Sequence, residues 1–354
     1  MVRELEIKVT RRPVSSLPGL ELKDLPFGRV FTDHMLLADY ADGEWGNVQI
    51  VPYGDIQVSP ALSALHYGQS FFEGIKAFRS ADGGVAIFRP DMNLKRFNGS
   101  ARRLEMPIVP EELFIDGMKR LIDIDRDWVP DYPEHSLYIR PFMFATQHTL
   151  GVRPSETYRF MVILSPSGPI FPKPMRIYVE EHFVRAVPGG IGFTKAAANY
   201  GAAMHPTAEA NRKGYDQVLW TDPFEHKWVQ EIGMMNVFFV IGERVVTPDL
   251  EQGTILAGVT RDSLLTVLRE SGIPTEERPV SIDELVEAYD RGELKEVFGA
   301  GTAATVLTIQ ELAYRGKPMV LSPDSYRVAP FLKQYLTDVR GGRKPDVHGW
   351  LLPV

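Results

Sequence analysis

The chain has 354 residues, a formal net charge of −7 and no cysteine. This length favours two domains, and the acidic balance argues against nucleic acid or an anionic membrane surface as a partner. Without cysteine the chain forms no disulfide, no thiolate zinc site and no cysteine nucleophile. We therefore expect a globular protein that acts on small molecules.

The N-terminus and the apolar runs favour a cytoplasmic location. The first residues read Met-Val-Arg-Glu-Leu-Glu-Ile-Lys, without the apolar stretch of a secretory signal. The longest apolar runs, at 160–164 and 237–241, are far shorter than the ~18 residues of a membrane helix. No membrane association is expected.

The N-terminal half alternates strand patterns with helix patterns. Apolar residues at steps of three and four predict helices at 91–104 and 111–128. Alternating or β-branched and aromatic runs, separated by turn residues, predict strands at 48–60, 85–88, 137–144 and 158–165.

A proline-rich segment follows, Ser165-Pro-Ser-Gly-Pro-Ile-Phe-Pro-Lys-Pro174, where we expect neither helix nor central strand. We place an interdomain linker at 166–175. It separates a smaller N-terminal α/β domain, residues 1–165, from a larger C-terminal domain, residues 176–354.

The second domain is predicted to hold a compact, mostly antiparallel sheet that resembles a β-barrel. Helix patterns at 262–270 and 282–291 flank this sheet. The fold class is therefore α/β, of the α+β kind, in two domains. The predicted strands are 176–179, 217–221, 228–231, 237–240, 244–247 and 296–298.

Lys195 is notable because small residues surround it in Gly189-Gly-Ile-Gly-Phe-Thr-Lys-Ala-Ala-Ala-Asn-Tyr-Gly201. Glycine and alanine leave room for a flat group to approach the backbone. Such a lysine is either a solvated loop residue, the commoner case, or an amine that forms a Schiff base with an aldehyde. The choice depends on whether the chain supplies the other parts of a pyridoxal-phosphate site.

Such a site needs a cation and backbone donors for the phosphate, an acid facing the pyridine nitrogen and a donor near the ring oxygen. Arg96 can supply the cation, and Glu231, at a strand end, can supply the acid. Tyr200, five residues after Lys195, can serve the ring oxygen. Alone, Arg96 is typical of a surface arginine and Glu231 of a strand end, so the prediction depends on the set.

Two glycine-rich turns offer backbone amides for the phosphate. Gly258-Val-Thr-Arg-Asp262 opens a predicted helix, where free N–H groups and the helix dipole favour an anion. Gly299-Ala-Gly-Thr-Ala303 follows a predicted strand and adds the Thr302 hydroxyl. Each turn alone is a weak signal.

Six segments in chain order give the sequence a resemblance to the branched-chain amino acid aminotransferases, which are pyridoxal-phosphate enzymes of fold type IV. They cover nearly the whole chain with compatible spacing. The segments are Phe31-Thr-Asp-His-Met35, Leu65-His-Tyr-Gly-Gln-Ser-Phe-Phe-Glu-Gly74, Leu137-Tyr-Ile-Arg-Pro141, residues 195–200, Leu256-Ala-Gly-Val-Thr-Arg-Asp262 and Gly299-Ala-Gly-Thr-Ala-Ala304.

The resemblance implies that Lys195 holds pyridoxal 5'-phosphate and moves the proton between the substrate and the cofactor. It implies that the cofactor is bound mainly by the larger domain. Together with Lys195, the implied cofactor-binding residues are Arg96, Tyr200, Glu231, Val259, Thr260 and Thr302.

For the substrate, the resemblance implies that Thr302 and Ala303 receive the α-carboxylate. Arg140 would pair with the distal carboxylate of glutamate, although a plain strand alternation with an exposed arginine is also open at this position. The residues implied to line an apolar side-chain pocket are Phe31, Tyr67, Phe72 and Tyr138.

The implied activity is transamination of L-leucine, L-isoleucine and L-valine with 2-oxoglutarate, giving branched-chain 2-oxo acids and L-glutamate. The loop His148-Thr-Leu-Gly-Val152 resembles one that reaches the neighbouring subunit's active site, so a homodimer is implied. His66 has no second ligand at metal spacing, so we expect a structural hydrogen bond there and no metal site.

Two positions depart from the family pattern. Met234 stands three residues after Glu231, where several relatives carry a hydroxyl residue, so a side-chain hydrogen bond there is not expected. Ala304 and Leu307 replace a thiol pair of some animal members, which excludes that form of thiol regulation.

Three alternatives stay open at this point. A D-amino acid aminotransferase and an aminodeoxychorismate lyase share the fold and the lysine, but Phe31 and the Tyr138–Arg140 strand favour the branched-chain enzyme. A non-catalytic nucleotide-binding protein could use the glycine-rich turns, yet neither has the Gly-x-Gly-x-x-Gly spacing and no Walker pair occurs.

Overall fold

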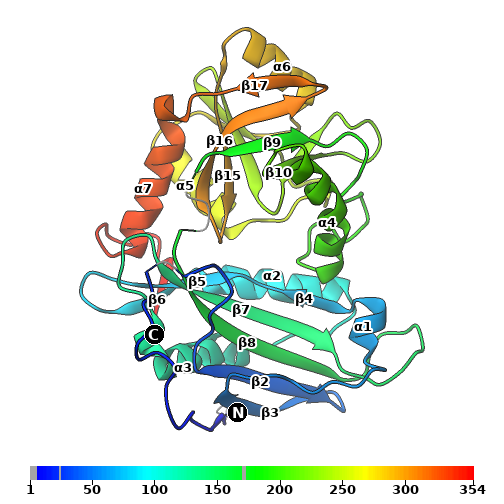
Figure 1. Cartoon of the computed structure of the whole chain (residues 1–354), viewed down its shortest axis with the longest axis vertical. Coiled ribbons are helices and arrows are strands. Elements are labelled where there is room, and N and C mark those ends of the chain that lie inside the picture. Colours follow the sequence, from blue (N-terminus) through cyan, green and yellow to red (C-terminus); the bar gives the residue numbers. More distant parts are fainter. Residues whose placement is uncertain (1–5, 24, 170–172) are drawn as a thin grey trace. The chain divides into compact units, whose positions relative to one another are not determined.

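The computed structural model describes residues 6–23, 25–169 and 173–354, which form two compact units (Figure 1). No helix within these ranges is long and apolar enough to cross a membrane. The first unit comprises Met1–Ile170, Thr194–Ala198 and Thr337–Val354, and the second comprises Phe171–Phe193 and Asn199–Leu336.

A mostly antiparallel sheet, with nine strands among the described residues, forms the basis of the first unit. The strand order is β1-β3-β2-β8-β7-β5-β6-β18, and β4 also pairs with β7. Among these strands only β1 and β3 run parallel. The strands are β1 (Lys8–Val9), β2 (His34–Ala41), β3 (Glu44–Pro52), β4 (Ser70–Phe72), β5 (Ile75–Arg79), β6 (Val85–Phe88), β7 (Ser136–Ala145), β8 (Tyr158–Ser167) and β18 (Leu351–Pro353).

Three helical segments cover one face of this sheet: α2 (Pro90–Arg103), η1 (Glu112–Asp116) and α3 (Gly117–Ile124) (Figure 1). Phe97 and Phe114 of these segments are fully buried and pack against Phe160 of β8. At Gly117 a Cβ would lie 2.8 Å from a Leu36 methyl group, so glycine allows the close approach of α3 to β2. The predicted single helix at 111–128 is instead a π-turn, an α-helix and the 3-10 turn η2 (Arg126–Trp128).

The second unit holds a mixed sheet, again with nine strands among the described residues. Its order is β11-β10-β9-β16-β15-β12-β13-β14, with β17 beside β16. Five of the described pairs are antiparallel and three are parallel. The strands are β9 (Met175–Val179), β10 (Gln217–Thr221), β11 (Val229–Ile232), β12 (Asn236–Ile241), β13 (Arg244–Thr247), β14 (Thr275–Glu277), β15 (Leu294–Gly301), β16 (Thr305–Tyr314) and β17 (Lys317–Val320).

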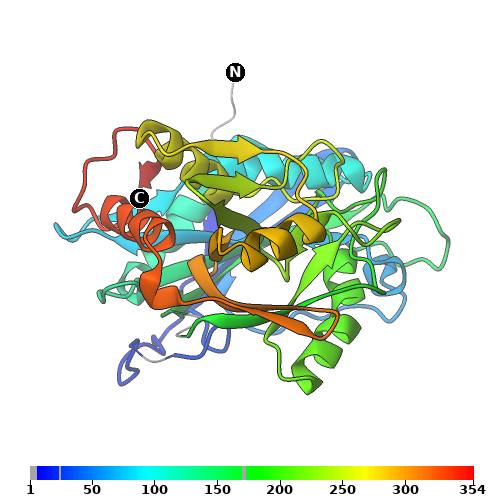
Figure 2. The ribbon, with the colours of Figure 1, turned by 90° about the horizontal axis from the view of Figure 1, so that it is seen from above.

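Helices flank this second sheet, as predicted. The helices α5 (Val259–Glu270) and α6 (Ile282–Asp290) both pack against β15, and Figure 2 shows α6 beside the strands of the sheet. The other helices of the chain are α1 (Ser63–Tyr67), α4 (Ala197–Arg212), η3 (Pro323–Ser325) and α7 (Val328–Arg340). The arrangement agrees with the predicted mixed α/β fold.

Two strand predictions were wrong. Residues 53–60 form no strand, because the pairing of β3 with β2 ends at Pro52. Conversely, β8 continues through Pro166, which pairs with Leu137 of β7. The pairing of β8 with β2 has already ended at Ile163, so the proline nitrogen points to a side without a ladder partner and no hydrogen bond is lost.

The division of the chain also differs from the predicted one. Residues 194–198 belong with the first unit because Ala196 forms a β-bridge with Phe71 of β4. The C-terminal segment belongs there because β18 pairs with β6. The second unit is therefore not continuous from 176 to 354, and the first unit is the larger one. The first crossing lies within the predicted segment 166–175, of which 170–172 fall outside the described residues.

Candidate active site

The backbone of Lys195 forms hydrogen bonds with two other segments of the first unit. Its carbonyl accepts the Phe72 N–H at 3.2 Å, and its own N–H donates to Ser100 Oγ of α2 at 3.1 Å. The Lys195 Nζ atom lies 5.2 Å from the centre of the Phe72 ring. The backbone of Lys195 therefore has a defined position relative to the first sheet.

Arg96, the predicted phosphate cation, is part of a buried ion pair. Its Nε and Nη2 atoms donate to the two carboxylate oxygens of Glu73 at 2.7 and 2.8 Å. Glu73 is fully buried and also accepts hydrogen bonds from Asn93 Nδ2 at 2.8 Å and the Gly74 N–H at 3.1 Å. Such a forked pair fixes the plane of the guanidinium.

The pKa of Glu73 reflects this environment. Burial by itself raises the pKa, but the charge and hydrogen bonds of Arg96, the nearby Lys195 charge and the Asn93 hydrogen bond together hold it below its usual value. Neither Glu73 nor Asn93 was predicted as a site residue. A carboxylate within the apolar run Phe71-Phe-Glu-Gly74 was the signal that could have pointed to Glu73.

Arg140 and Tyr138 form a cluster with Phe72 on the first sheet. The Arg140 guanidinium lies 4.4 Å from the Phe72 ring centre, and its Nη2 atom donates to the Tyr138 hydroxyl at 3.0 Å. Gly74 makes this arrangement possible, because a Cβ there would lie 2.3 Å from the Tyr138 hydroxyl oxygen. Arg140 Nε is buried and has no hydrogen-bond partner among the described residues. A buried N–H of this kind is a donor suited to an anion.

The two remaining predicted pocket residues, Phe31 and Tyr67, have contacts with other residues. Phe31 stacks on Tyr53, with ring centres 4.7 Å apart and an interplanar angle of 12°. Tyr67 ends α1, is 42% exposed and donates its hydroxyl to the Leu150 carbonyl. Instead, Phe27, which carried no motif, packs edge-on against Tyr138 at 4.9 Å.

In the second unit, Glu231 lies in β11 and is buried. Its Oε1 accepts the Leu256 N–H at 2.7 Å and lies 3.5 Å from Asn236 Nδ2, and its Oε2 lies 3.3 Å from Arg185 Nη2. The carboxylate is thus oriented by three groups from separate segments. Neither Arg185 nor Asn236 was predicted, because both come to Glu231 only through the folding of the sheet.

Met234 lies at the tip of the hairpin between β11 and β12. Ile232 and Met235 exchange two backbone hydrogen bonds, and Gly233 has a φ of +54°, as a type II′ turn requires at its first central position. The Met234 side chain is 62% exposed. The residue therefore contributes its backbone to a tight turn.

The first glycine-rich turn leads into α5, with Gly258 at the N-cap and Val259 and Thr260 buried in the first turn. A Cβ at Gly258 would lie 2.0 Å from Asn236 Oδ1. The buried Arg261 holds this end of the helix, because its Nη2 atom contacts the Pro248 carbonyl and the Glu277 carboxylate at 2.9 and 2.8 Å. The helix start is therefore fixed and has no side-chain cap.

The second glycine-rich turn connects β15 and β16. Gly299 and Gly301 pack against Met235, and a Cβ at either would lie 3.1 to 3.3 Å from its side chain. Thr302 and Ala303 follow in the turn and are partly buried. Tyr200 lies in the first part of α4 and is also partly buried.

His66 donates a hydrogen bond from Nε2 to the Pro60 carbonyl at 2.8 Å, which fits the predicted structural role. Within the described residues, no group of three or more His, Asp and Glu side chains is arranged to hold a metal ion.

Comparisons with known proteins identify the family of this chain. The class IV aminotransferase family matches residues 70–312. A probable branched-chain-amino-acid aminotransferase of Staphylococcus aureus (strain N315) is 49% identical over 98% of both chains. The chain belongs to the branched-chain aminotransferases of class IV.

A second relative of this aminotransferase is branched-chain-amino-acid transaminase 1 of Bacillus subtilis (strain 168), 46% identical over 93% of this chain and 94% of the relative. Among solved structures, the T.th. branched-chain amino acid aminotransferase complexed with N-(5'-phosphopyridoxyl)-L-glutamate has a TM-score of 0.72 at 29% identity, covering 89% and 97% of the two chains. The predicted family and fold class are confirmed, and an enzyme is favoured over a non-catalytic nucleotide-binding protein.

Proposed function

We propose that this aminotransferase exchanges amino groups between the L-forms of leucine, isoleucine and valine and 2-oxoglutarate, with pyridoxal 5'-phosphate as cofactor. The observation that carries the proposal is the cluster on the first sheet, where the Lys195 amine and the Arg140 guanidinium both lie over the Phe72 ring. An apolar surface beside a cation suits a site that takes an apolar side chain in one half-reaction and a carboxylate in the other.

The residues of the chain fit the cofactor. Pyridoxal phosphate supplies the electron sink that stabilises negative charge at the substrate α-carbon. Lys195 would bind the cofactor through Nζ and would then take and return the proton of that carbon. Glu231, which Arg185 and the Leu256 N–H orient, would face the pyridine nitrogen.

The phosphate would be held by a cation and by backbone amides. Arg96 supplies a guanidinium whose plane Glu73 fixes. Val259 and Thr260 supply the amides at the start of α5, where the helix dipole favours an anion. Thr302 adds a hydroxyl, and Tyr200 would serve the ring oxygen.

For the substrate, we propose that Thr302 and Ala303 bind the α-carboxylate. Arg140 would bind the distal carboxylate of glutamate, which is supported by its buried Nε without a partner in the described chain. The proposed side-chain pocket consists of Phe31, Tyr67, Phe72 and Tyr138.

We further propose a cytoplasmic homodimer. The loop at 148–152 presents Leu150 and Val152 with exposed fractions of 67% and 85%, and Leu65 of α1 is 65% exposed. Tyr67 links α1 to this loop through its hydrogen bond to Leu150. Large exposed apolar side chains gathered in this way are typical of a protein interface.

Substitution of Lys195 tests the function. Lys195→Ala should lower turnover of L-leucine with 2-oxoglutarate by more than about a thousandfold, because the amine both binds the cofactor and moves the proton. Steady-state kinetics measure the loss, and borohydride reduction with peptide mapping should mark Lys195 in the unsubstituted protein. Lys213→Ala, at an exposed lysine that follows α4, is the control and should keep full turnover.

A Lys195→Ala protein with full turnover would contradict the proposed function. The substrate panel separates the alternatives. Preferred turnover of D-alanine over L-leucine would identify a D-amino acid aminotransferase, and release of pyruvate from aminodeoxychorismate would identify a lyase.

A further inference from the structure

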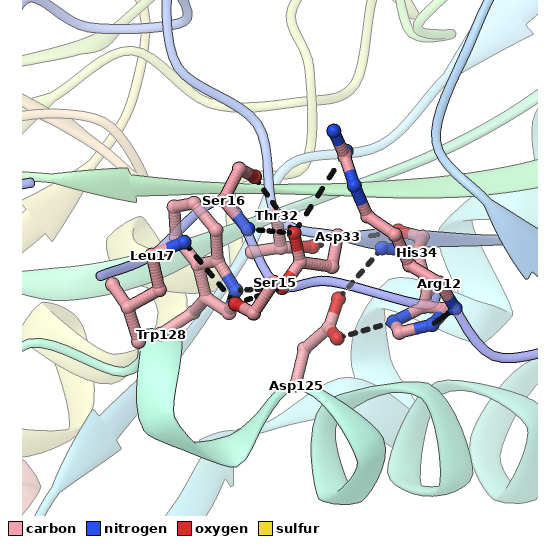
Figure 3. Close-up of polar contacts among 9 residues, drawn as sticks. All are labelled: Arg12, Ser15, Ser16, Leu17, Thr32, Asp33, His34, Asp125 and Trp128. Atoms are coloured by element: carbon pink, nitrogen blue, oxygen red, sulfur yellow. Dashed lines mark hydrogen bonds and ion pairs between the residues drawn. The ribbon is translucent and has the colours of Figure 1, made fainter. Parts of the chain in front are cut away.

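The Asp33 carboxylate closes a long loop of the first unit (Figure 3). Its Oδ1 accepts the Ser16 N–H at 2.8 Å and the Ser16 hydroxyl at 2.7 Å. Its Oδ2 accepts the Ser15 hydroxyl at 2.5 Å and Trp128 Nε1 at 3.0 Å. The side chain is nearly fully buried, so both ends of the segment 16–33 are tied to one buried anion.

A second anchor stands beside the first. The His34 N–H and Nδ1 contact the two oxygens of Asp125 at 3.0 and 2.6 Å, and His34 Nε2 accepts the Arg12 N–H at 2.8 Å (Figure 3). Because Nε2 accepts, the ring proton is on Nδ1 and is donated to Asp125. The N-terminal segment before the loop is thereby also fixed to the start of β2.

The closed loop carries one aromatic residue, Phe27, that contacts the proposed substrate cluster. Phe27 packs edge-on against Tyr138, whose hydroxyl accepts the Arg140 hydrogen bond. The loop is also attached through the Lys23 carbonyl, 2.6 Å from His135 Nε2, and through the Val30 carbonyl, which accepts the Ser165 hydroxyl at 2.7 Å. Phe27 therefore connects the loop whose ends Asp33 ties together with Tyr138 and Arg140.

We infer that Asp33 is a positioning residue for substrate selection: it holds loop 16–33 closed, and the loop holds Tyr138 and Arg140 through Phe27. This inference rests on the proposed function. Asp33 touches neither substrate nor cofactor in this scheme. Loss of its hydrogen bonds should therefore weaken substrate binding more than it slows the chemical step.

Asp33→Asn is the sharpest variant, because it keeps the volume of the side chain but turns one acceptor oxygen into a donor. The Ser15 hydroxyl and Trp128 Nε1 would then face an NH₂ group or leave their partner. We expect the KM for 2-oxoglutarate and L-leucine to rise about three- to tenfold, with kcat within about twofold. Trypsin should also cleave faster after Lys23 and Arg29, which are exposed within the loop.

Phe27→Ala separates the contact of the loop with Tyr138 from the hydrogen bonds of Asp33 at the loop ends. It should raise KM as Asp33→Asn does but leave trypsin cleavage unchanged, because the loop ends stay tied. In the double variant the KM effects should be smaller than their product, since both act on one path. Asp39→Asn is the matched control on β2, where the partly exposed Asp39 accepts hydrogen bonds from Arg159 and Asn47. It should change neither the KM nor the rate of trypsin cleavage.

Three results would overturn the inference. They are an unchanged KM in Asp33→Asn, faster trypsin cleavage of Asp33→Asn without a rise in KM, or an unchanged KM in Phe27→Ala. Failure of the proposed function is distinct from these results. An unsubstituted protein that does not use L-leucine would refute the function, while the cleavage comparison would still test the closure of the loop.

Discussion

Lys76 is a buried lysine on β5, opposite Tyr138 of β7. Burial, and to a lesser extent the charge of Arg340, lower its pKa and Glu134 opposes them, so that the pKa is about 7. In the unfolded chain the pKa of a lysine is about 10.4. Between these values the unfolded chain binds more protons, so this residue makes the free energy of unfolding rise with pH.

Lys76→Met tests this reasoning. The variant should be more stable than the unsubstituted protein at pH 7, because a buried amine no longer has to lose its proton or its hydration. The difference should shrink by about 2 kcal/mol between pH 7 and pH 9, at roughly 1.4 kcal/mol per unit. Urea unfolding at several pH values measures the difference.

The control is Lys95→Met, at an exposed lysine of α2, for which we expect a difference that does not vary with pH. Parallel pH dependence of Lys76→Met and the unsubstituted protein would show that Lys76 keeps its ordinary protonation behaviour in the folded state.

At the scale of the element, α5 begins at Gly258, where the neighbouring side chain leaves no room for a Cβ. The φ of Gly258 is −71°, which any residue adopts, so backbone strain is not the reason for glycine. The reason is Asn236, whose amide oxygen would lie 2.0 Å from a Cβ. That amide group also lies against Glu231 and bonds to the Leu256 carbonyl.

Gly258→Ala should therefore displace the Asn236 amide and lower the free energy of unfolding by ~1–3 kcal/mol, the usual cost of overpacking. Retention of pyridoxal phosphate on dialysis should fall as well, because the displaced amide no longer orients Glu231. Denaturant unfolding and the visible absorption of the bound cofactor measure the two effects.

Gly99→Ala is the control for this substitution. Gly99 lies within α2, and a Cβ there meets nothing within 4 Å. Alanine should stabilise this helix by about 0.5–1 kcal/mol through its higher helix propensity. A Gly258→Ala protein that is as stable as this control and keeps its cofactor would contradict the packing argument.

At the scale of the whole molecule, the exposed loop at 148–152 carries the prediction of a homodimer. Val152→Asp should shift the protein from dimer to monomer in size-exclusion chromatography with light scattering, because a carboxylate would be buried in an apolar interface. Val347→Asp, at a valine of the first unit that is 73% exposed, should leave the mass unchanged. Equal masses for both variants would place the interface elsewhere.

Much of the fold could be predicted where the pattern is local. The strands at β6, β10 and β13 were predicted to the residue, because turn residues bound each short apolar run. The helix α4 was not predicted, because only Asn199, Pro206 and Ala210 of it are buried and no apolar stripe marks it. The strand β18 has three residues, too few for a periodic pattern.

The residues of the candidate site also fall into those that a local sequence pattern predicts and those that depend on distant partners. Lys195 and the two glycine-rich turns are visible in the sequence, because a lysine among small residues and a run of glycines are local features, whereas Arg140 was implied only by the family resemblance. Glu73, Arg185 and Phe27 gain their importance only from partners that are distant in the sequence. Arg185 meets Glu231 across 46 positions, and neither residue alone differs from a surface charge.

By itself, the sequence of this protein determined the order of its motifs, through them the class IV aminotransferase family, and the lysine that we propose for the chemistry. Tertiary structure alone decided which charges are paired and which later segments of the chain belong to the first unit. Asp33 shows the physical reason, since Ser15, Ser16 and Trp128 come to it from positions up to 95 residues away. The local periodicity of the sequence does not predict such a contact, because the free energy that stabilises the contact comes from burial of the whole first unit.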